Sequence, residues 1–542
     1  MAQRYDAIVV GAGHNGLTTA AYLAKAGLDV LVLERRYLVG GAAVSEEIHP
    51  GFTYSVCSYV VSLMQPEVVR ELDLPKHGFE VLPLEGYLAP GEDGDSLYVS
   101  DNPAETRWEI ARHSRRDAEI YDEFNLMMYS MAHAVKPLLG MVPFDPASPG
   151  DGGSRTGMRL VRHLRQLGPK RLNALTKLMT MSASDYLDEW FETDQLKAVM
   201  ALNGIIGTFL GPRSPGTAYV MLHHFMGGVD GAFTVWGFQK GGTGGVSEAI
   251  AAAARSYGAT IRCSAPVEQV LVKGGRAVGV ALESGEEIAA DLVVSGADPR
   301  VTFRRLVDER ELPDDLVTAI DNFKFRGSSG KVNLALDGLP TFTCRPEPDA
   351  LTGFIEIAPS MDFLERAYDD AKYGSFSQRP YMDVIIPSMV DPTVAPPGKH
   401  MMSLFVQYAP YELEGGWTDQ QREAFGDAVI RTLAEFAPDI EDHILHRQVL
   451  TPWDLEQEFS LSEGNIFQGE LTLDQLFFNR PAARWSDYRT PIKGYYQCGS
   501  GTHPGGGITS APGRLAALEI LKDQRLRRRG GHHAAATDGG QA

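Results

Sequence analysis

The sequence predicts an α/β protein of at least two domains, and three observations support this prediction. The chain has 542 residues, more than a single hydrophobic core usually organises. A strand, a glycine-rich turn, a helix and a second strand follow one another between Ala7 and Glu34. Near the other end, Tyr495 to Ile508 has the pattern of another strand, a glycine-rich loop and the start of a helix.

The chain between these two segments changes character along its length. Residues 104 to 230 have a mostly helical pattern that is rich in Met and Leu, and Val246 to Ser256 is an alanine-rich helix. From residue 524 the chain is rich in Arg and then in Gly, Ala and His, which predicts a disordered tail. Hydrophobic runs separated by turns or proline-rich loops predict strands at 261–272, 277–282, 287–294, 330–337, 353–358, 382–387 and 401–408.

Composition and charge exclude several classes of function. The formal net charge of −20 argues against a nucleic-acid partner, because phosphate binding needs a basic face. Four cysteines far apart in the chain form no CxxC pair, so we expect neither a disulfide framework nor a metal site. No apolar run is long enough to span a bilayer, and the start of the chain does not read as a secretory signal. A cytoplasmic location fits these features.

The first glycine-rich turn predicts a dinucleotide site. The segment Gly11-Ala12-Gly13-His14-Asn15-Gly16 has the spacing G-x-G-x-x-G directly after a strand and at the start of a helix. Gly11 permits the tight turn, Gly13 lets the backbone approach a pyrophosphate, and Gly16 lets the helix pack on the strand. The helix N-terminus favours the phosphates. Glu34, followed by Arg35, closes the second strand at the distance expected for a ribose-binding acid, and a carboxylate there disfavours NADP.

Two further features favour FAD over NAD. Gly40-Gly41-Ala42 follows the acid and offers a second close backbone approach, suited to the longer cofactor. The distant segment from Gly499 and Ser500 to Gly506, Gly507 and Ile508 provides the loop and helix start that FAD enzymes use to hold the ribityl chain and flavin ring. A helix N-terminus beneath the ring stabilises the charge of the reduced flavin.

With these motifs the chain resembles the phytoene-desaturase-like branch of the FAD-dependent amine oxidase and carotenoid desaturase superfamily. Within it, the chain is most similar to a subgroup of bacterial carotene ketolases and proteins called pyridine nucleotide-disulfide oxidoreductase domain-containing protein 2. The resemblance runs nearly the whole length of the chain. The matching stretches are Gly11–Gly16, Glu34 with Gly40–Gly41, Lys240–Gly244, Ser295–Pro299, Asp391–Thr393 with Ala395–Gly398, Arg480–Pro481 and Gly501–Gly507.

The resemblance implies a Rossmann-like FAD-binding domain of the glutathione-reductase type, with an inserted substrate domain made of a mixed sheet and a helical lobe. It implies that FAD is held noncovalently, because no cysteine matches the position used for covalent attachment. The backbone of Val267 matches the position that meets the adenine. The cofactor-binding residues expected from the motifs and the resemblance are Gly11, Gly13, His14, Asn15, Gly16, Glu34, Arg35, Gly40, Gly41, Ala42, Val267, Gly499, Ser500, Gly506, Gly507 and Ile508.

These matches also suggest how the chain divides into domains. We expect residues 1–105, 235–305 and 488–523 to form a discontinuous FAD-binding domain. Residues 106–234 and 306–487 are expected to form the substrate domain, and residues 524–542 the tail.

Two residues are candidates for catalysis. Lys331 opens a predicted strand and resembles the lysine that amine oxidases hold near flavin N5, the alternative being a surface lysine at a strand end. His503 lies in the flavin loop, where it can touch the ring or only brace the loop. Five aromatic residues can line a substrate tunnel, with ordinary core packing as the alternative for each. They are Tyr54, Tyr59, Phe225, Phe233 and Trp236.

A basic amphipathic stretch at residues 155–177 contains no acid, and its leucines are interleaved with basic residues that include Arg159, Arg162, Arg165, Lys170 and Arg171. Such a stretch can lie on an anionic membrane, and the alternative is a solvated helix face. The expected partners are a hydrophobic small-molecule substrate and an electron acceptor such as oxygen or a quinone. A peripheral membrane contact and a homo-oligomer stay open.

Three functions remain from the sequence. The leading hypothesis is an FAD-dependent oxidoreductase that dehydrogenates or oxidises a hydrophobic substrate, of the carotenoid, isoprenoid or lipid-like kind, by hydride transfer to flavin N5. The second is an FAD-dependent amine oxidase. The third is an isomerase or another protein that uses FAD without net redox chemistry.

Overall fold

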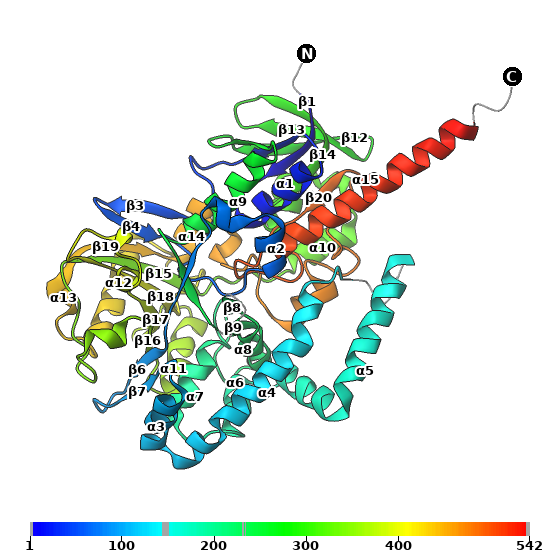
Figure 1. The fold of residues 1–542 in the computed structure, drawn as a ribbon. Helices are drawn as coiled ribbons and strands as arrows, with labels where there is room; N and C mark the ends of the chain where they lie inside the picture. Colours follow the sequence, from blue (N-terminus) through cyan, green and yellow to red (C-terminus); the bar gives the residue numbers. More distant parts are fainter. Residues whose placement is uncertain (1–3, 144–150, 230–231, 234, 538–542) are drawn as a thin grey trace.

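Two large β-sheets, each covered by helices, organise the chain (Figure 1). The structure is a computed structural model and describes residues 4–143, 151–229, 232–233 and 235–537. The α/β fold class predicted from the sequence is confirmed, because a largely parallel sheet and a second, mixed sheet both occur.

The first sheet has seven strands drawn from three distant parts of the sequence. Its parallel strands pair in the order β11, β2, β1 and β14, with β20 beside β14, while β13 and β12 continue it in antiparallel fashion. These strands are β1 (Arg4–Val10), β2 (Val30–Leu33), β11 (Thr260–Arg262), β12 (Val267–Lys273), β13 (Arg276–Leu282), β14 (Glu287–Ser295) and β20 (Tyr495–Gln497).

Both faces of the first sheet are buried, which explains why β1 and β2 are runs of apolar residues rather than alternating ones. Ala7 and Val9 pack on one face with α1 (His14–Lys25), α9 (Gly244–Ser256) and α15 (Ala511–Thr537). Ile8 and Val10 pack on the other face, beside α10 (Asp314–Asp321).

The second sheet also has seven strands, in the order β19, β15, β18, β17, β16, β6 and β7. All its neighbours are antiparallel except β16 and β6, which run parallel. The strands are β6 (Tyr87–Pro90), β7 (Ser96–Val99), β15 (Ser329–Leu336), β16 (Phe354–Ile357), β17 (Tyr381–Ile385), β18 (His400–Gln407) and β19 (Ile444–Leu450).

The two faces of the second sheet differ in chemistry. Val332, Leu334 and Leu404 lie in an apolar core on one face, and α12 (Asp419–Ala434) and α13 (Ile440–His443) contribute further members of that core. Alternate residues of the same strands, such as Lys331 and Asn333, point to the opposite face. That opposite face looks toward the helical lobe.

The helical lobe occupies the segment where the sequence predicts helices, residues 104 to 230. Its helices pack on the second sheet together with α11 (Met361–Lys372), as their shared apolar core shows. The lobe helices are α3 (Pro103–His113), α4 (Arg115–Leu139), α5 (Asp151–Thr180), α6 (Ala183–Asp188), α7 (Asp194–Leu202) and α8 (Thr217–Phe225).

Shorter elements connect the two sheets. The helices are α2 (Pro66–Glu71) and α14 (Pro452–Phe459). The two-stranded ribbons pair β3 (Ser45–His49) with β4 (Phe52–Ser55), β5 (Val81–Pro83) with β10 (Gly237–Gln239), and β8 (Gly228–Val229) with β9 (Ala232–Phe233).

The structure departs from the predicted elements at three places. The strand expected at 261–272 is two strands, because the chain turns at Ser264, whose φ of 52° is left-handed. Residues 87–99 join the second sheet, although they fall within the segment assigned to the FAD-binding domain. The expected tail from residue 524 begins inside α15, which continues to Thr537, and residues 538–542 lie outside the described part.

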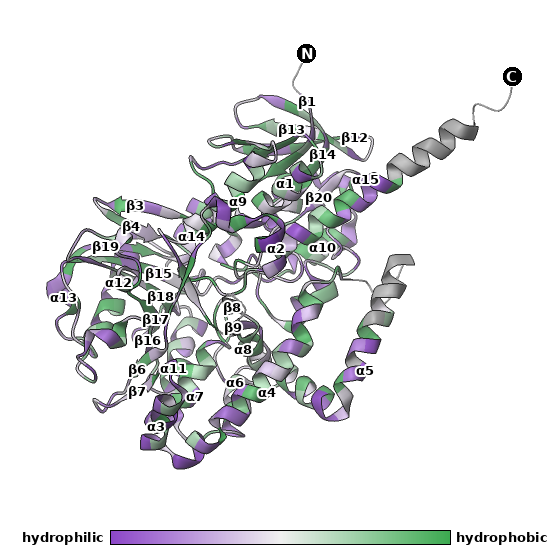
Figure 2. Cartoon of the chain, viewed as in Figure 1, coloured by the Kyte–Doolittle hydropathy of each residue, from purple (hydrophilic) through white to green (hydrophobic). Residues whose placement is uncertain are grey.

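The helix α5 is kinked at Gly168, whose φ of 73° is left-handed, and its part before the kink stands apart from the body of the molecule in Figure 1. In Figure 2, α5 carries several purple, hydrophilic segments. Met158, Val161 and Leu172 are exposed on it, as are the neighbouring basic residues Arg162 and Arg165. In the part of the chain that the structure describes, no helix is both long and apolar enough to cross a bilayer.

A close helix contact yields the first prediction. A Cβ built on Gly513 of α15 would lie 2.2 Å from the carbonyl oxygen of Asn15 in α1, so Gly513→Ala forces two backbones apart. We expect a loss of about 1–3 kcal/mol in the free energy of unfolding, measured by urea titration. Gly140→Ala is the control, because its φ is −91° and the nearest atom lies 3.8 Å away. Equal stability of both variants would contradict the prediction.

Candidate functional site

Three adjoining cavities run from the first sheet to the helical lobe. We call them the nucleotide pocket, of about 400 Å³, the chamber, of about 110 Å³, and the large cavity, of about 700 Å³. His14, Ala42, Ile466 and Ser500 line both the nucleotide pocket and the chamber. Ile206, His224 and Trp236 line both the chamber and the large cavity.

The nucleotide pocket lies at the carboxyl ends of β1 and β2. The glycine turn has the geometry its sequence predicts. Gly11 has a φ of 94°, and a Cβ on Gly16 would lie 2.2 Å from the carbonyl oxygen of Gly11, so neither position accepts a side chain without a shift. No heavy atom lies within 4 Å of a Cβ built on Gly13, so the space above that residue is open to a ligand.

Glu34 fixes the shape of this turn. Its carboxylate accepts hydrogen bonds from the backbone N–H groups of Ala12 (2.7 Å) and Arg36 (2.9 Å), and the residue is buried. The backbone N–H of Gly40 donates to the carbonyl oxygen of Ala12 at 2.9 Å, which brings the glycine doublet beside the turn. The first glycine-rich segment and the second therefore form one wall.

Most of the predicted cofactor-binding residues border this pocket. It is lined by Gly11, Gly13, His14, Asn15, Gly16, Glu34, Arg35, Gly40, Gly41, Ala42, Val267 and Ser500. Gly507 and Ile508 line the chamber instead. Gly499 and Gly506 line neither. A Cβ on Gly499 would meet the carbonyl of Ala297 at 2.6 Å, and one on Gly506 would meet Phe467 at 2.5 Å, so both permit close packing behind the wall.

Polar atoms without a protein partner gather at the nucleotide pocket. Among the buried side-chain atoms that the structure describes, His14 Nε2, Asn15 Oδ1 and Arg36 Nη1 have no hydrogen-bond partner. Buried polar groups are rarely left unsatisfied, so these atoms fit a polar ligand such as a pyrophosphate and ribityl chain. Sequence analysis missed Arg36. By contrast, Arg35 donates from Nη2 to the backbone carbonyls of Gln457 and Glu458.

Lys331 lies in the wall of the chamber. The residue is buried, so it is not the surface lysine that the sequence left as the alternative. Its ammonium donates to the Asn333 Oδ1 at 2.8 Å and to the Ser403 hydroxyl. The residue is only 2% exposed, and burial lowers its pKa to about 7. A lysine with this pKa exchanges its proton near neutral pH.

His503 occupies a different place. It is not among the residues that line the three cavities. The His503 Nε2 lies 3.1 Å from the carbonyl oxygen of Leu138. The Tyr488 hydroxyl donates to the backbone carbonyl oxygen of His503 at 2.9 Å. Burial lowers the pKa of His503 to about 4, which leaves the ring neutral. These contacts fit bracing of the loop. The catalytic role of His503 stays a prediction, and the position of the residue outside the three cavities does not support it.

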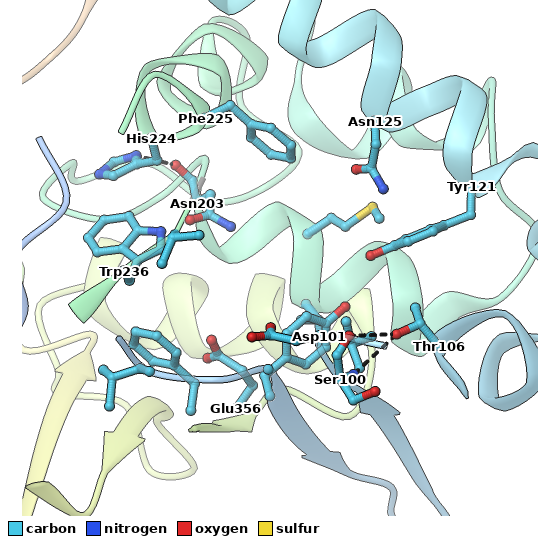
Figure 3. A pocket seen from close by; sticks show the side chains of 18 of the residues that line it. Ser100, Asp101, Thr106, Tyr121, Asn125, Asn203, His224, Phe225, Trp236 and Glu356 are labelled. Carbon is cyan, nitrogen blue, oxygen red and sulfur yellow. Dashed lines mark hydrogen bonds between the residues drawn. The ribbon is translucent and has the colours of Figure 1, made fainter. Parts of the chain in front are cut away.

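The large cavity is lined by aromatic and apolar side chains with a few polar ones. Figure 3 shows Trp236, Phe225 and Tyr121 bordering it from different sides, with the carboxyl group of Glu356 turned into the same space. Of the five aromatic residues considered from the sequence, Phe225 and Trp236 line this cavity, and Tyr59 lines the chamber. Tyr54 lines none of the three, and the side chain of Phe233 lies outside the described part.

Sequence reasoning missed the polar face of the second sheet. Three cross-strand rows on this face carry buried polar side chains, and the opposite face is apolar. Alternation of polar and apolar residues along β15 would have pointed to Asn333 beside Lys331, but the partners on β16 to β18 depend on strand pairing. The rows are Ser329–Gln407–Tyr381, Lys331–Phe405–Asp383–Glu356 and Asn333–Ser403–Ile385.

Comparison with known proteins identifies the family. The model of the flavin containing amine oxidoreductase family matches residues 161–520, and a model of an NAD(P)-binding Rossmann-like domain matches residues 9–72. The chain belongs to the flavin containing amine oxidoreductase family. The resemblance inferred from the sequence is confirmed, and the chain is an FAD-dependent oxidoreductase that acts on a small molecule.

Relatives match over nearly their whole length. Pyridine nucleotide-disulfide oxidoreductase domain-containing protein 2 of Rattus norvegicus is 40% identical, with 96% of this chain and 94% of that protein covered. A limonene dehydrogenase component from Castellaniella defragrans is 28% identical, with 96% and 95% covered. Among solved structures, wild-type putrescine oxidase bound to putrescine has a TM-score of 0.59 at 17% identity, with 96% and 99% covered, and shows the likeness in fold.

The hydrogen bonds of Glu34 yield a prediction on cofactor affinity. Both carboxylate oxygens of Glu34 accept a backbone hydrogen bond, one from Ala12 and one from Arg36. The amide in Glu34→Gln has a single oxygen that can accept such a bond, and the substitution also removes a negative charge from the pocket. Because hydrogen bonds to charged groups contribute about 1.5–3 kcal/mol, we expect FAD to bind roughly tenfold to a hundredfold more weakly. Fluorescence titration of the apoprotein with FAD measures this.

The matched control is Glu268→Gln, because Glu268 also lines the nucleotide pocket but is exposed. We expect its affinity for FAD to change little. Equal weakening by both substitutions would contradict a specific role for Glu34.

Proposed function

We propose that the chain holds FAD noncovalently across the nucleotide pocket and the chamber, and oxidises a C–H bond of a substrate whose apolar body fills the large cavity. Bound FAD would supply the hydride acceptor for this reaction. The observation that carries the proposal is the sequence of cavities: a pocket walled by the glycine motifs opens through His14 and Ser500 to the chamber of Lys331, and then to the large cavity.

The chain's own residues would divide the work. The backbone of Gly13 and the side chains of Asn15 and Arg36 would hold the phosphates, with Glu34 on the adenosine ribose. The Asn15 amide donates to the Ser500 hydroxyl at 3.0 Å, so the pyrophosphate end and the flavin end of the site are linked. Lys331 would hold or release a proton at its Nζ beside the flavin.

Noncovalent binding is supported by the state of the thiol nearest the proposed flavin position. Among the described residues that line the chamber, Cys57 is the one cysteine. Cys57 is buried there, and burial raises the pKa of its thiol to about 12. A thiol with this pKa stays protonated at neutral pH and is a poor nucleophile toward a flavin ring.

An apolar substrate is supported by the lining of the large cavity and by the name of one relative, a limonene dehydrogenase component. The passage between chamber and cavity is formed by Ile206, His224 and Trp236. These side chains would exclude water from the reacting bond.

Anaerobic mixing with hydrophobic candidate substrates tests this function. We expect bleaching of the flavin absorbance, and product formed without bleaching would support an isomerase instead.

In Lys331→Met we expect at least one flavin half-reaction to slow by at least about tenfold and to lose its pH dependence near 7, because the titrating ammonium is gone. Stopped-flow absorbance measures both half-reactions.

The matched control for Lys331 is Lys273→Met, which removes an exposed lysine at the end of β12. We expect both of its half-reactions to keep the rates and pH profile of the unchanged protein. Unchanged half-reactions in Lys331→Met would rule out its role while leaving the cofactor assignment intact.

We also propose that α5 contacts an anionic membrane surface. Met158, Val161, Arg162 and Arg165 border one shallow surface hollow, so apolar and basic groups share a face. We expect flotation with phosphatidylserine vesicles that weakens as salt is raised, and none with phosphatidylcholine vesicles. Flotation that is absent, or insensitive to salt, would refute the proposal.

A further inference from the structure

Two carboxyl groups face each other in the wall of the large cavity. Glu356 on β16 and Asp383 on β17 are directly paired across the antiparallel strands, so their side chains lie on the same face about 5 Å apart at Cβ. Both residues line the large cavity. Their oxygens Glu356 Oε2 and Asp383 Oδ1 are buried and have no hydrogen-bond partner among the described residues.

The surroundings of this pair are acidic and aromatic. Among the described residues that line the large cavity, none is Lys or Arg, whereas Asp101 and Asp122 add two exposed carboxylates. The titratable groups that act on the pair are three tyrosines, one of them on β17 itself, and one lysine two strands away. They are Tyr59, whose hydroxyl donates to Asp383, together with Tyr87, Tyr381 and Lys331.

A buried carboxyl pair is costly when no cation is in contact with it, and neither Glu356 nor Asp383 forms an ion pair with another described residue. Burial raises the pKa of Asp383 to about 7, although the Tyr59 hydroxyl and the charge of Lys331 act in the opposite direction. Burial and the charge of Asp383 raise the pKa of Glu356 well above its usual range, so the pair retains a proton near neutral pH. A positive charge placed between the free oxygens would offset this cost, and aromatic rings such as Trp236 and Phe354 in the same lining favour a cation further.

The pair is separated from the chamber by a known number of strands. Lys331 pairs with Phe405, Phe405 with Asp383, and Asp383 with Glu356. At about 4.8 Å per strand, Asp383 lies about 10 Å and Glu356 about 14 Å along the sheet from Lys331. A group bound at the pair would therefore lie away from the bond that faces the chamber.

We propose that Glu356 and Asp383 form an anchoring site for the positively charged nitrogen of an otherwise apolar, elongated substrate, and that they hold this nitrogen remote from the carbon presented to the chamber. The inference rests on the proposed function for the identity of the chamber. It adds the class of substrate, an amphiphilic ammonium, and the end by which that substrate is held. The head group is an anchor here and not the group that reacts.

Binding of two probes of matched shape tests the anchor. Isothermal titration of the FAD-loaded protein with n-octylammonium and with 1-octanol compares a cationic with a neutral head on the same chain. Because a charge-assisted hydrogen bond contributes more than a neutral one, we expect the ammonium to bind at least about tenfold more tightly. Its binding should release protons, seen as a dependence of the heat on the buffer's ionisation enthalpy.

Variants assign the preference to the pair. Glu356→Gln and Asp383→Asn should each abolish most of the preference for the ammonium while 1-octanol binds as before. Glu356 Oε2 has no hydrogen-bond partner among the described residues, whereas Asp383 accepts a hydrogen bond from Tyr59. Glu356→Gln is therefore the variant expected to keep its fold, which FAD content and thermal unfolding check. Asp122→Asn, at the exposed end of the cavity, is the control and should keep the preference.

The proposal is overturned if the two probes bind the unchanged protein equally or not at all, or if the preference survives in both pair variants. These readouts need no turnover. A protein that prefers the ammonium but never shows flavin bleaching would keep the anchor and refute the proposed oxidation. A protein that oxidises neutral substrates but shows no preference for the ammonium would keep the proposed oxidation and refute the anchor.

Discussion

The structure depends most on a backbone contact that only glycine allows. The helix α1 crosses the end of β1 so closely that a Cβ on Gly16 would lie 2.2 Å from the Gly11 carbonyl oxygen, and α15 meets α1 at Gly513 with the same closeness. Because of these contacts, residues 11 to 16 and the segment after β20 lie side by side. The hydrogen bond from Asn15 to Ser500 then joins the two halves of the cofactor site.

A second constraint acts through the seven-stranded mixed sheet. One face is covered by α12 and is wholly apolar in its central strands, which leaves the other face free to carry polar groups. Those groups are buried because the helical lobe covers them. Burial in this environment of low polarity lowers the pKa of Lys331 and raises the pKa values of Asp383 and Glu356, because it disfavours the charged form of each group.

The site combines short sequence motifs with side chains that come together from distant parts of the chain. The glycine spacing and Glu34 were readable because each acts within a few residues of the chain, where turn geometry and helix entry follow from residue type. Arg35 and His503 show the limit of such reading. Both lie in the right segments, yet the side chain of Arg35 donates to the backbone of α14, at Gln457 and Glu458, and His503 lies against Leu138.

The sequence by itself determined the α/β class, the order of the strands around Gly11 and Glu34, the family, and Lys331 as a residue of interest. It could not reveal that Glu356 faces Asp383, because cross-strand register is set by pairing among residues far apart in the chain. It also could not place Gly499 and Gly506 behind the wall rather than in it. Burial decides which polar groups stay unpaired, and burial exists only once the helical lobe covers the sheet.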